Sequence, residues 1–220
     1  MKRLLLIPVL LIALSGCAGE PGTVANSHGH SNPADIKDVN GDSPFKGAWL
    51  DQPYELPVGE FTDTSDLVVQ WPTDGLPGEV TIVFFGYTHC ADGFCQTQTA
   101  NAAAAIRGLS AELRAKVKFL FISSDPARDT PEVLRAFLDQ YDPSFIGYTG
   151  DFAQIKAAAS DLGVELEDPP SPAPTDGYEV AHGTQLIGFG PNGTAPVVWL
   201  PETPVADLRA DLATLANGNW

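Results

Sequence analysis

The chain has 220 residues, of which 28 are Asp or Glu and only 12 are Lys or Arg, so its formal net charge at pH 7 is −16. Such an acidic surface argues against binding to nucleic acid and against binding anionic lipid head groups by charge. Once the N-terminal segment is set aside, the length suits about one domain with a sizeable core.

The chain begins with the pattern of a bacterial lipoprotein signal. A basic pair is followed by an apolar stretch over residues 4–14, which is too short to span a bilayer as a mature helix. The sequence LSGC that ends at Cys17 has the form of a lipobox. It predicts removal of residues 1–16, a lipid on the sulfur of Cys17, and an extracytoplasmic protein anchored to the cell membrane. An ordinary signal peptide with an incidental cysteine is the alternative.

A polar segment follows the lipobox. Residues 17–46 are rich in Gly, Ser, Asn, Asp and Pro and lack apolar periodicity, which predicts a flexible tether. His28 and His30 lie in this segment. A His-x-His pair could hold copper or zinc, but two histidines in a polar linker usually have no such role, and the choice stays open. We expect the folded domain to occupy residues 47–220.

The domain is predicted to open with an N-terminal extension. Residues 49–69 carry short alternating segments separated by Pro and Gly, which favour a hairpin beside the domain. Residues 71–75 (WPTDG) predict a turn into the next strand.

The two cysteines of the domain follow a strand that is predicted to be central. Residues 80–85 are all apolar or β-branched, which predicts a strand buried on both faces. Cys90 and Cys95 come after its end, and residues 96–113 behind them are Ala-rich and free of Pro, which predicts one helix. A cysteine at a helix start has its pKa lowered toward thiolate by the helix dipole. Both redox chemistry and soft-metal binding need thiolates.

Strands and helices alternate in the middle of the chain. Residues 117–123 and 145–148 predict strands. Residues 132–141 predict a helix capped by Thr130, and residues 152–162 predict a helix that begins with a capping box at Asp151. The alternation predicts an α/β sheet with right-handed crossovers.

The C-terminal part predicts a surface loop and a hairpin. Residues 167–178 contain four prolines and predict a surface excursion. Residues 184–189 and 195–200 flank an Asn-Gly pair, which predicts an antiparallel hairpin, and a last helix is expected to end near residue 216. A parallel start and an antiparallel finish predict an α/β thioredoxin-like fold with an N-terminal hairpin extension and an inserted Pro-rich loop.

Several sequence blocks, in this order, resemble one family. The blocks are FFGYTHC-x-D at residues 84–92, SSDP-x-RDTPEVLRAF at 123–137, FIGYTG at 145–150 and the lone downstream His182. From about residue 54 onward the chain resembles the Sco (SenC) family of copper-binding, thioredoxin-fold proteins. The family usually has three residues between its cysteines and a Pro after each, whereas this chain has four, with Ala and Gln in place of the prolines. Ala181 stands where the family usually has Asp.

The resemblance implies a copper ion held by Cys90, Cys95 and His182. It implies a membrane-tethered metallochaperone that delivers copper to a copper centre of a respiratory oxidase, with an oxidase subunit or another copper apoprotein as partner. Copper(I) is soft and binds thiolate and imidazole well, which agrees with this set.

The spacing of the cysteines restricts the loop that joins them. In a continuous helix, four intervening residues would rotate the second thiol roughly 140° away from the first. The loop therefore cannot be entirely helical if both sulfurs bind one ion. Gly93 can adopt positive φ, which would leave Cys95 at the helix start and push Phe94 toward solvent or onto an apolar surface. The same loop would permit a disulfide.

Neighbouring polar residues are expected to support the site without binding metal. His89 is adjacent to Cys90, and adjacent side chains leave a strand end in opposite directions. Asp125 and Asp129 follow the second strand and lie at the same sheet edge, where we expect a capped loop in which Arg128 pairs with a carboxylate. Tyr87 could pack over the cysteine loop.

Other functions remain open from the sequence. In a thiol-disulfide oxidoreductase, Cys90 and Cys95 would be the catalytic redox pair, but such enzymes usually have two intervening residues and a cis-Pro that residues 180–183 lack. In a peroxiredoxin, a Thr would stand where Tyr87 is. A purely stabilising disulfide, a binding module and a Sco relative without copper binding are further alternatives.

Overall fold

The computed structural model describes residues 43–171, 177–218 and 220. The predicted signal peptide, Cys17, His28 and His30 lie outside the described residues. Among the described residues, no helix is long and apolar enough to cross a membrane.

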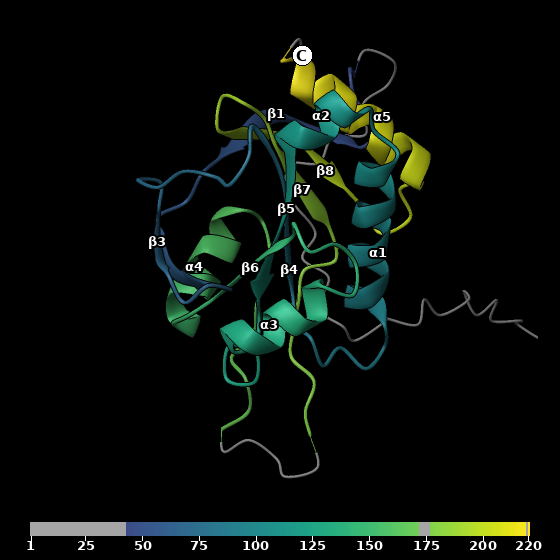
Figure 1. The fold of residues 1–220 in the computed structure, drawn as a ribbon. Helices are drawn as coiled ribbons and strands as arrows, with labels where there is room; N and C mark the ends of the chain where they lie inside the picture. The colour runs from purple at the N-terminus through teal and green to yellow at the C-terminus, as the bar shows by residue number, and fades with distance from the viewer. Residues whose placement is uncertain (1–42, 172–176, 219) are drawn as a thin grey trace, which may run out of the picture.

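The described residues form one sheet of eight strands in the order β1-β8-β7-β4-β5-β6-β2-β3. The central strands β4, β5 and β6 are parallel, and β7 and β8 continue the sheet as an antiparallel hairpin beside β4 (Figure 1). This is the predicted thioredoxin-like arrangement. The strands are β1 (Ala48–Glu55), β2 (Gly59–Asp63), β3 (Val68–Trp71), β4 (Val80–Gly86), β5 (Val117–Ser123), β6 (Ile146–Thr149), β7 (Leu186–Phe189) and β8 (Thr194–Trp199).

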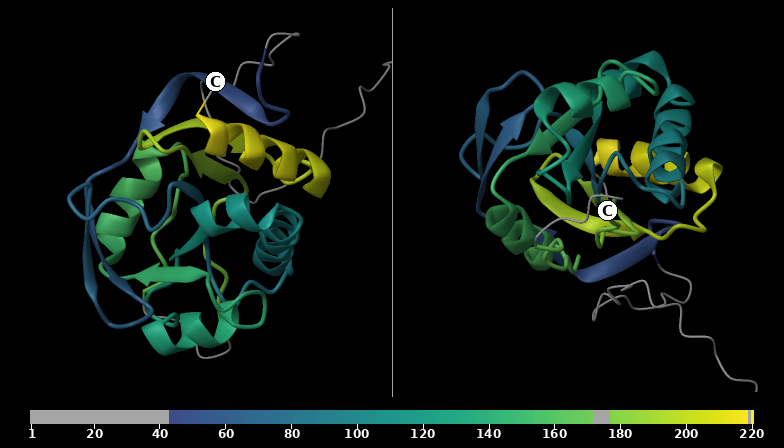
Figure 2. Two further views of the ribbon diagram at one scale, coloured as in Figure 1. Left: turned by 45° about the horizontal axis from the view of Figure 1, so that its top comes forward. Right: turned by 90° about the horizontal axis from the view of Figure 1, so that it is seen from below.

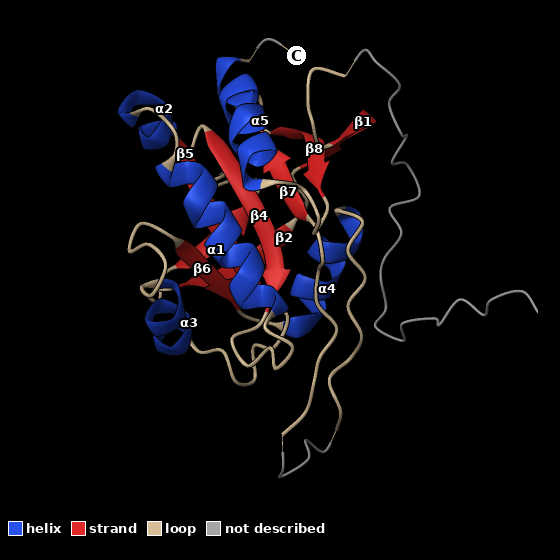
Figure 3. Ribbon diagram, turned by 90° about the vertical axis from the view of Figure 1, so that its right-hand side faces the viewer, coloured by secondary structure: helices blue, strands red, loops and turns tan. Residues whose placement is uncertain are grey.

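Helices cover both faces of the sheet, as Figures 2 and 3 show. On one face α1, α3 and α5 contribute side chains to one core cluster, and on the other face α4 and the β2–β3 hairpin contribute to a second. The helices are α1 (Phe94–Arg107), α2 (Ala111–Lys116), α3 (Pro131–Leu138), α4 (Phe152–Asp161) and α5 (Val205–Asn217).

Strand β4 is central because its side chains are apolar on both faces. Every residue of β4 is buried. Ile82 and Phe84 belong to the core under α1, whereas Val83 and Phe85 belong to the core under α4. Strand β4 pairs with β5 along its whole length, from Val80 to Gly86, and this pairing sets where the strand ends and the cysteine loop begins.

The single helix predicted for residues 96–113 is wrong. Helix α1 ends at Arg107, with Gly108 as its C-cap, and the short helix α2 begins after Ser110. The Ser110 hydroxyl accepts a hydrogen bond from the Leu113 backbone N–H at 3.3 Å. A glycine followed by an N-capping serine ends one helix and starts another, which the Ala-rich composition concealed.

The N-terminal extension is divided between two parts of the sheet. The predicted hairpin exists as β2 and β3 and joins the sheet through β6. Residues 48–55 do not belong to that hairpin, because β1 pairs with β8 at the opposite edge. Without β1, strand β8 would be an exposed edge with unpaired backbone N–H and C=O groups. The pairing satisfies these groups, so the N-terminal extension is part of the sheet.

The remaining elements lie within a few residues of their predicted bounds. Helix α3 is capped by Thr130 and α4 by Asp151, as predicted. The capping box of α4 is only half formed, because the Gln154 side chain accepts from the Glu60 N–H at 2.8 Å instead of from Asp151. Gly193 has φ 79° in the β7–β8 turn, as an Asn-Gly turn requires.

Candidate metal centre

The site lies where β4 ends. After Gly86 the chain enters the cysteine loop, and the segment that carries His182 runs past the same strand end. The backbone N–H of Gly183 donates to the carbonyl of Phe85 at 2.8 Å, which fixes this segment against β4. A Cβ on Gly183 would lie only 3.0 Å from that carbonyl oxygen, so the close approach favours glycine.

Gly93 resolves the spacing of the cysteines in the predicted way. It has φ 74° and is the N-cap of α1, so that Phe94 begins the helix and Cys95 lies in its first turn. The Cys95 backbone N–H donates to the Cys90 sulfur at 3.3 Å. Positive φ at Gly93 therefore turns the chain back and brings the second cysteine over the first.

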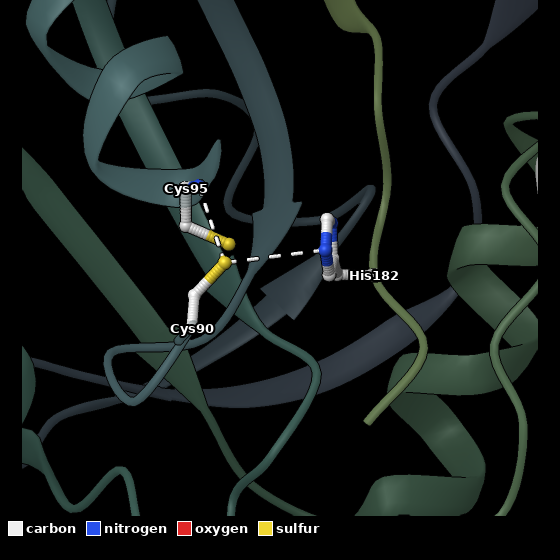
Figure 4. Close-up of side chains that lie close together, drawn as sticks. All are labelled: Cys90, Cys95 and His182. Carbon is white, nitrogen blue, oxygen red and sulfur yellow. Dashed lines mark hydrogen bonds between the residues drawn. The ribbon is translucent and has the colours of Figure 1, made fainter. Parts of the chain in front are cut away.

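The structure brings together the three residues predicted as ligands. The sulfurs of Cys90 and Cys95 and a ring nitrogen of His182 all lie within 4.8 Å of one another (Figure 4). The Cys90 Sγ to His182 Nε2 distance is 4.0 Å. Both cysteines are buried and free, so no disulfide joins them. Among the described residues, this is the one group of His, Cys, Asp and Glu donors with the spacing of a metal site.

His182 presents one defined nitrogen to the thiols. Its Nδ1 is 2.8 Å from the Gly183 carbonyl, which can only accept, so Nδ1 carries the proton and Nε2 keeps its lone pair for a ligand. The ring is flanked by Tyr87 and Phe94, with centroid distances of 5.7 and 5.4 Å. Phe94 also packs against the apolar core cluster that contains the cysteines, one of the two outcomes predicted for it.

The two thiols are not equivalent. A hydrogen bond from the Cys95 thiol lowers the pKa of Cys90 to about 6, against the opposing effect of burial. Burial, together with the Cys90 sulfur, raises the pKa of Cys95. Burial favours neutral His182, but its hydrogen bonds to the Cys90 sulfur and the Gly183 carbonyl, together with the negative charges of Cys90 and Asp92, raise its pKa. The pair therefore favours one thiolate, on Cys90, bonded to one protonated thiol.

Asp92 lies against this donor set, although its sequence position predicted no role for it. The Cys90 sulfur is 3.0 Å from Asp92 Oδ1, which also accepts from the Phe94 N–H at 2.8 Å. Asp92 Oδ2 is 3.9 Å from His182 Nε2. The available signal was the position of a carboxylate inside the lengthened loop between the cysteines.

His89 is not part of the donor set. Its side chain is 52% exposed, and its Nδ1 lies 2.9 Å from the Thr88 hydroxyl and 3.7 Å from Asp129. The side chain of Tyr87 is buried and belongs to the same core cluster as the cysteines, as expected.

Asp125 and Asp129 have structural partners, as predicted. Asp125 is buried, pairs with Arg128, and accepts from the Tyr178 hydroxyl at 2.9 Å. Asp129 accepts from the hydroxyls of Thr88 and Ser123 at 2.6 and 2.7 Å. These bonds occupy both carboxylates beneath the site.

An aromatic and charged cluster ties the His182 segment to the loop after β5, which sequence reasoning missed. The Arg128 guanidinium lies 3.8 Å from the centroid of the Tyr178 ring and donates to the Tyr178 carbonyl at 2.9 Å. The Tyr87 hydroxyl donates to Glu179. Nothing in the spacing of Tyr178 and Arg128, fifty residues apart, indicated this contact.

Comparisons with known proteins agree with the geometry. The family model described as SCO1/SenC matches residues 56–217. The mitochondrial protein SCO2 of Saccharomyces cerevisiae is 34% identical over 120 residues, which are 54% of this chain and 40% of that protein. The chain thus spans less than half the length of that relative.

Solved structures show the same fold. Yeast Sco1 with copper bound superposes with a TM-score of 0.67 and 25% identity, covering 76% of this chain and 91% of that one. A SCO1/SenC family lipoprotein from Bacillus anthracis gives a TM-score of 0.61 and 26% identity, covering 76% and 98%.

Proposed function

Because the chain belongs to the SCO1/SenC family, we propose that it is a copper metallochaperone whose cargo is held by Cys90, Cys95 and His182. The observation that carries the proposal is the convergence of two free thiols and one imidazole nitrogen within 4.8 Å. The copper-bound structure of yeast Sco1, which shares the fold, supports the choice of metal.

The chemistry of the donor set fits copper(I). Thiolates and imidazole are soft ligands, and three of them meet the coordination number that copper(I) accepts. Cys95 is buried and its pKa is raised, so a second thiolate is costly beside the first without a cation. A copper ion supplies that charge, and its binding releases the thiol proton.

Delivery would proceed by ligand exchange. An incoming thiolate of the acceptor replaces one ligand at a time, so copper is shared briefly between donor and acceptor. His182 is the ligand nearest to solvent, with a side chain 14% exposed, while Cys95 is fully buried. His182 is therefore the ligand we expect an acceptor to displace first. The proposed acceptor is a copper centre of a respiratory oxidase.

We also propose that the protein acts at the outer face of the cell membrane through a lipid on Cys17. The lipobox supports this, and a relative from Bacillus anthracis is itself described as a lipoprotein.

The test is an anaerobic copper(I) titration. A Cys17→Ser background leaves Cys90 and Cys95 as the remaining thiols. We expect one copper per chain, and Cys90→Ala, Cys95→Ala and His182→Ala each to lower the copper(I) affinity by at least about tenfold. His89→Ala is the matched control, since His89 adjoins Cys90 but lies outside the donor set. If all variants bound copper(I) as tightly as the unsubstituted protein, Cys90, Cys95 and His182 would not be the copper site.

A second function is favoured by one observation, the unequal acidity of the two thiols. The pKa of Cys90 is lowered to about 6 and that of Cys95 is raised. In a thiol-disulfide oxidoreductase, Cys90 would attack the disulfide of a partner as the thiolate, and Cys95 would resolve the mixed disulfide. The partner's disulfide would be reduced as Cys90 and Cys95 are oxidised. The two functions therefore differ in what passes to the partner, copper or electrons.

A further inference from the structure

Helix α1 carries one of the three proposed ligands and contacts the segments that carry the other two. Cys95 lies in its first turn, whereas Cys90 lies in the loop before the helix and His182 lies in the segment before β7. The three side chains meet only if both segments keep a fixed position relative to α1. Two glutamines of α1, Gln96 and Gln98, form hydrogen bonds to these segments.

Gln96 holds the cysteine loop. Its side-chain amide donates to the Cys90 carbonyl at 3.1 Å, and the Gly93 N–H donates to the same carbonyl at 3.3 Å. Gln96 stands where the family usually has Pro, whose side chain has no donor for such a bond. The longer loop of this chain is therefore tied to α1 by a hydrogen bond that a Pro at this position could not make.

The stability of the fold does not explain the amide of Gln96. Among the described residues, its Oε1 is one of the buried side-chain atoms without a hydrogen-bond partner. A buried, unpaired oxygen destabilises a fold. The Cys90 carbonyl also does not need this amide, because the Gly93 N–H already bonds to it. A residue that is unfavourable for stability at this position is accounted for by a role in positioning Cys90.

Gln98 holds the segment that carries His182. Its side chain is buried, and its amide donates to the Thr184 carbonyl at 3.0 Å. Gln98 lies three residues after Cys95, so both residues are on the same face of α1. The hydrogen bond therefore connects the helix that presents Cys95 to the backbone two residues after His182.

We propose that Gln96 and Gln98 are positioning residues, which set the positions of Cys90 and His182 relative to Cys95. The inference rests on the proposed copper function and adds to it the residues that organise the donor set. Neither glutamine binds the cargo, because each acts through a backbone carbonyl at or near a ligand. Removal of groups that orient metal ligands typically lowers metal affinity by about 10- to 100-fold.

The experiment replaces each amide with an apolar side chain of similar length. Gln96→Met and Gln98→Met are made in the full chain with Cys17→Ser, and copper(I) affinity is measured against a chromophoric chelator. We expect each variant to bind copper(I) about tenfold more weakly. The urea midpoint of Gln96→Met should be unchanged or raised, because the unpaired Oε1 is removed. A merely structural role would lower the midpoint together with the affinity.

A second measurement needs no copper. The Cys95 N–H bonds to the sulfur of the other cysteine, and the Gly183 N–H bonds to the end of β4. We expect the first N–H to exchange with solvent about tenfold faster in Gln96→Met, and the second about tenfold faster in Gln98→Met. The amides in the centre of β4 should keep their protection, because a general loosening of the fold would speed exchange there too.

Gln154→Met is the matched control. Gln154 also joins a helix to a strand, since its side chain accepts from the Glu60 N–H at 2.8 Å, but neither α4 nor β2 carries a ligand. This variant should leave copper(I) affinity and both exchange rates unchanged. Unchanged affinity in Gln96→Met or Gln98→Met, or an equal loss in Gln154→Met, would overturn the assignment. If the unsubstituted protein binds no copper, the proposed function itself falls, and the exchange rates decide whether the glutamines hold the two segments.

Discussion

At the scale of single residues, two glycines allow the three donors to meet. Gly93 takes the positive φ that brings Cys95 over Cys90. Gly183 lets the His182 segment approach the end of β4 at hydrogen-bond distance. The donors need these two backbone positions as much as they need the right side chains.

Gly93→Ala tests whether positive φ at Gly93 positions Cys95. Nothing lies within 4 Å of a Cβ added at Gly93, so the cost is conformational and not steric. We expect the free energy of unfolding to fall by about 1 kcal/mol. Copper(I) affinity should fall too, because relaxation of φ displaces Cys95. Denaturant unfolding and the copper titration measure the two effects.

The matched control for Gly93→Ala is Gly75→Ala. Gly75 also has positive φ, 68°, and also has open space around an added Cβ, but it lies in the turn before β4. It should lose similar stability and keep its copper affinity. If both variants lose affinity equally, local backbone geometry at Gly93 is not what positions Cys95.

At the scale of elements, the site is held by three pieces of chain. Strand β4 supplies the fixed end, α1 presents Cys95 from its first turn, and residues 178–183 carry His182. The last piece has no regular structure of its own, so its position depends on the Gly183 hydrogen bond to β4 and on side-chain contacts. The Arg128–Tyr178 stack and the Arg128–Asp125 ion pair supply them.

Arg128→Ala tests whether this stack positions His182. Removal of the guanidinium leaves the buried Asp125 carboxylate unpaired, so the free energy of unfolding should fall by about 3 kcal/mol. The variant should still bind one copper, with lower affinity and an altered spectrum, because His182 loses its support. Arg128→Lys keeps the charge without the planar stack and should recover only part of the loss.

Arg135→Ala is the control for the loss of an arginine. Arg135 pairs with Asp139 and donates to the Phe145 carbonyl within the α3 region, away from residues 178–183. It should lower stability and leave copper affinity unchanged. Unchanged affinity in Arg128→Ala as well would show that the stack has no part in positioning His182.

The features that could be predicted from the sequence are those decided by residues close together in the chain. The apolar run of β4, the Thr130 and Asp151 caps and the positive φ of Gly93 each follow from a few neighbouring residues. The resemblance to a family supplied the choice of His182. The broken helix at Gly108 could have been read from the Gly and the Ser that follows.

Long-range contacts could not be predicted in the same way. The Arg128–Tyr178 stack and the Tyr87–Glu179 hydrogen bond join residues distant in sequence, and no periodicity connects them. The pairing of β1 with β8 instead of β2 is also decided by the whole sheet. Hydrogen bonds to either strand would satisfy the backbone N–H and C=O groups of β1. The contact of Asp92 with the Cys90 sulfur likewise depends on a side-chain orientation fixed by the Phe94 N–H.

At the scale of the whole molecule, the sheet places the donors together. Parallel β4 and β5 end at one edge, and the antiparallel β7 starts at that edge, so the segment before β7 meets the loop after β4 (Figure 3). In open α/β sheets, ligands bind at this edge. The fold thus brings the cysteines and His182 together, although they are about ninety residues apart in the chain.

The most direct test of the chaperone proposal follows what passes to an acceptor. Copper(I)-loaded protein is mixed with a copper-free oxidase fragment whose two-cysteine copper site is reduced, and the two are separated and assayed for copper. We expect copper to move to the fragment while Cys90 and Cys95 remain thiols. The contrary result is that copper stays behind, while the copper-free protein reduces the disulfide form of the fragment and becomes oxidised at Cys90 and Cys95. That result would make the protein a thiol-disulfide oxidoreductase.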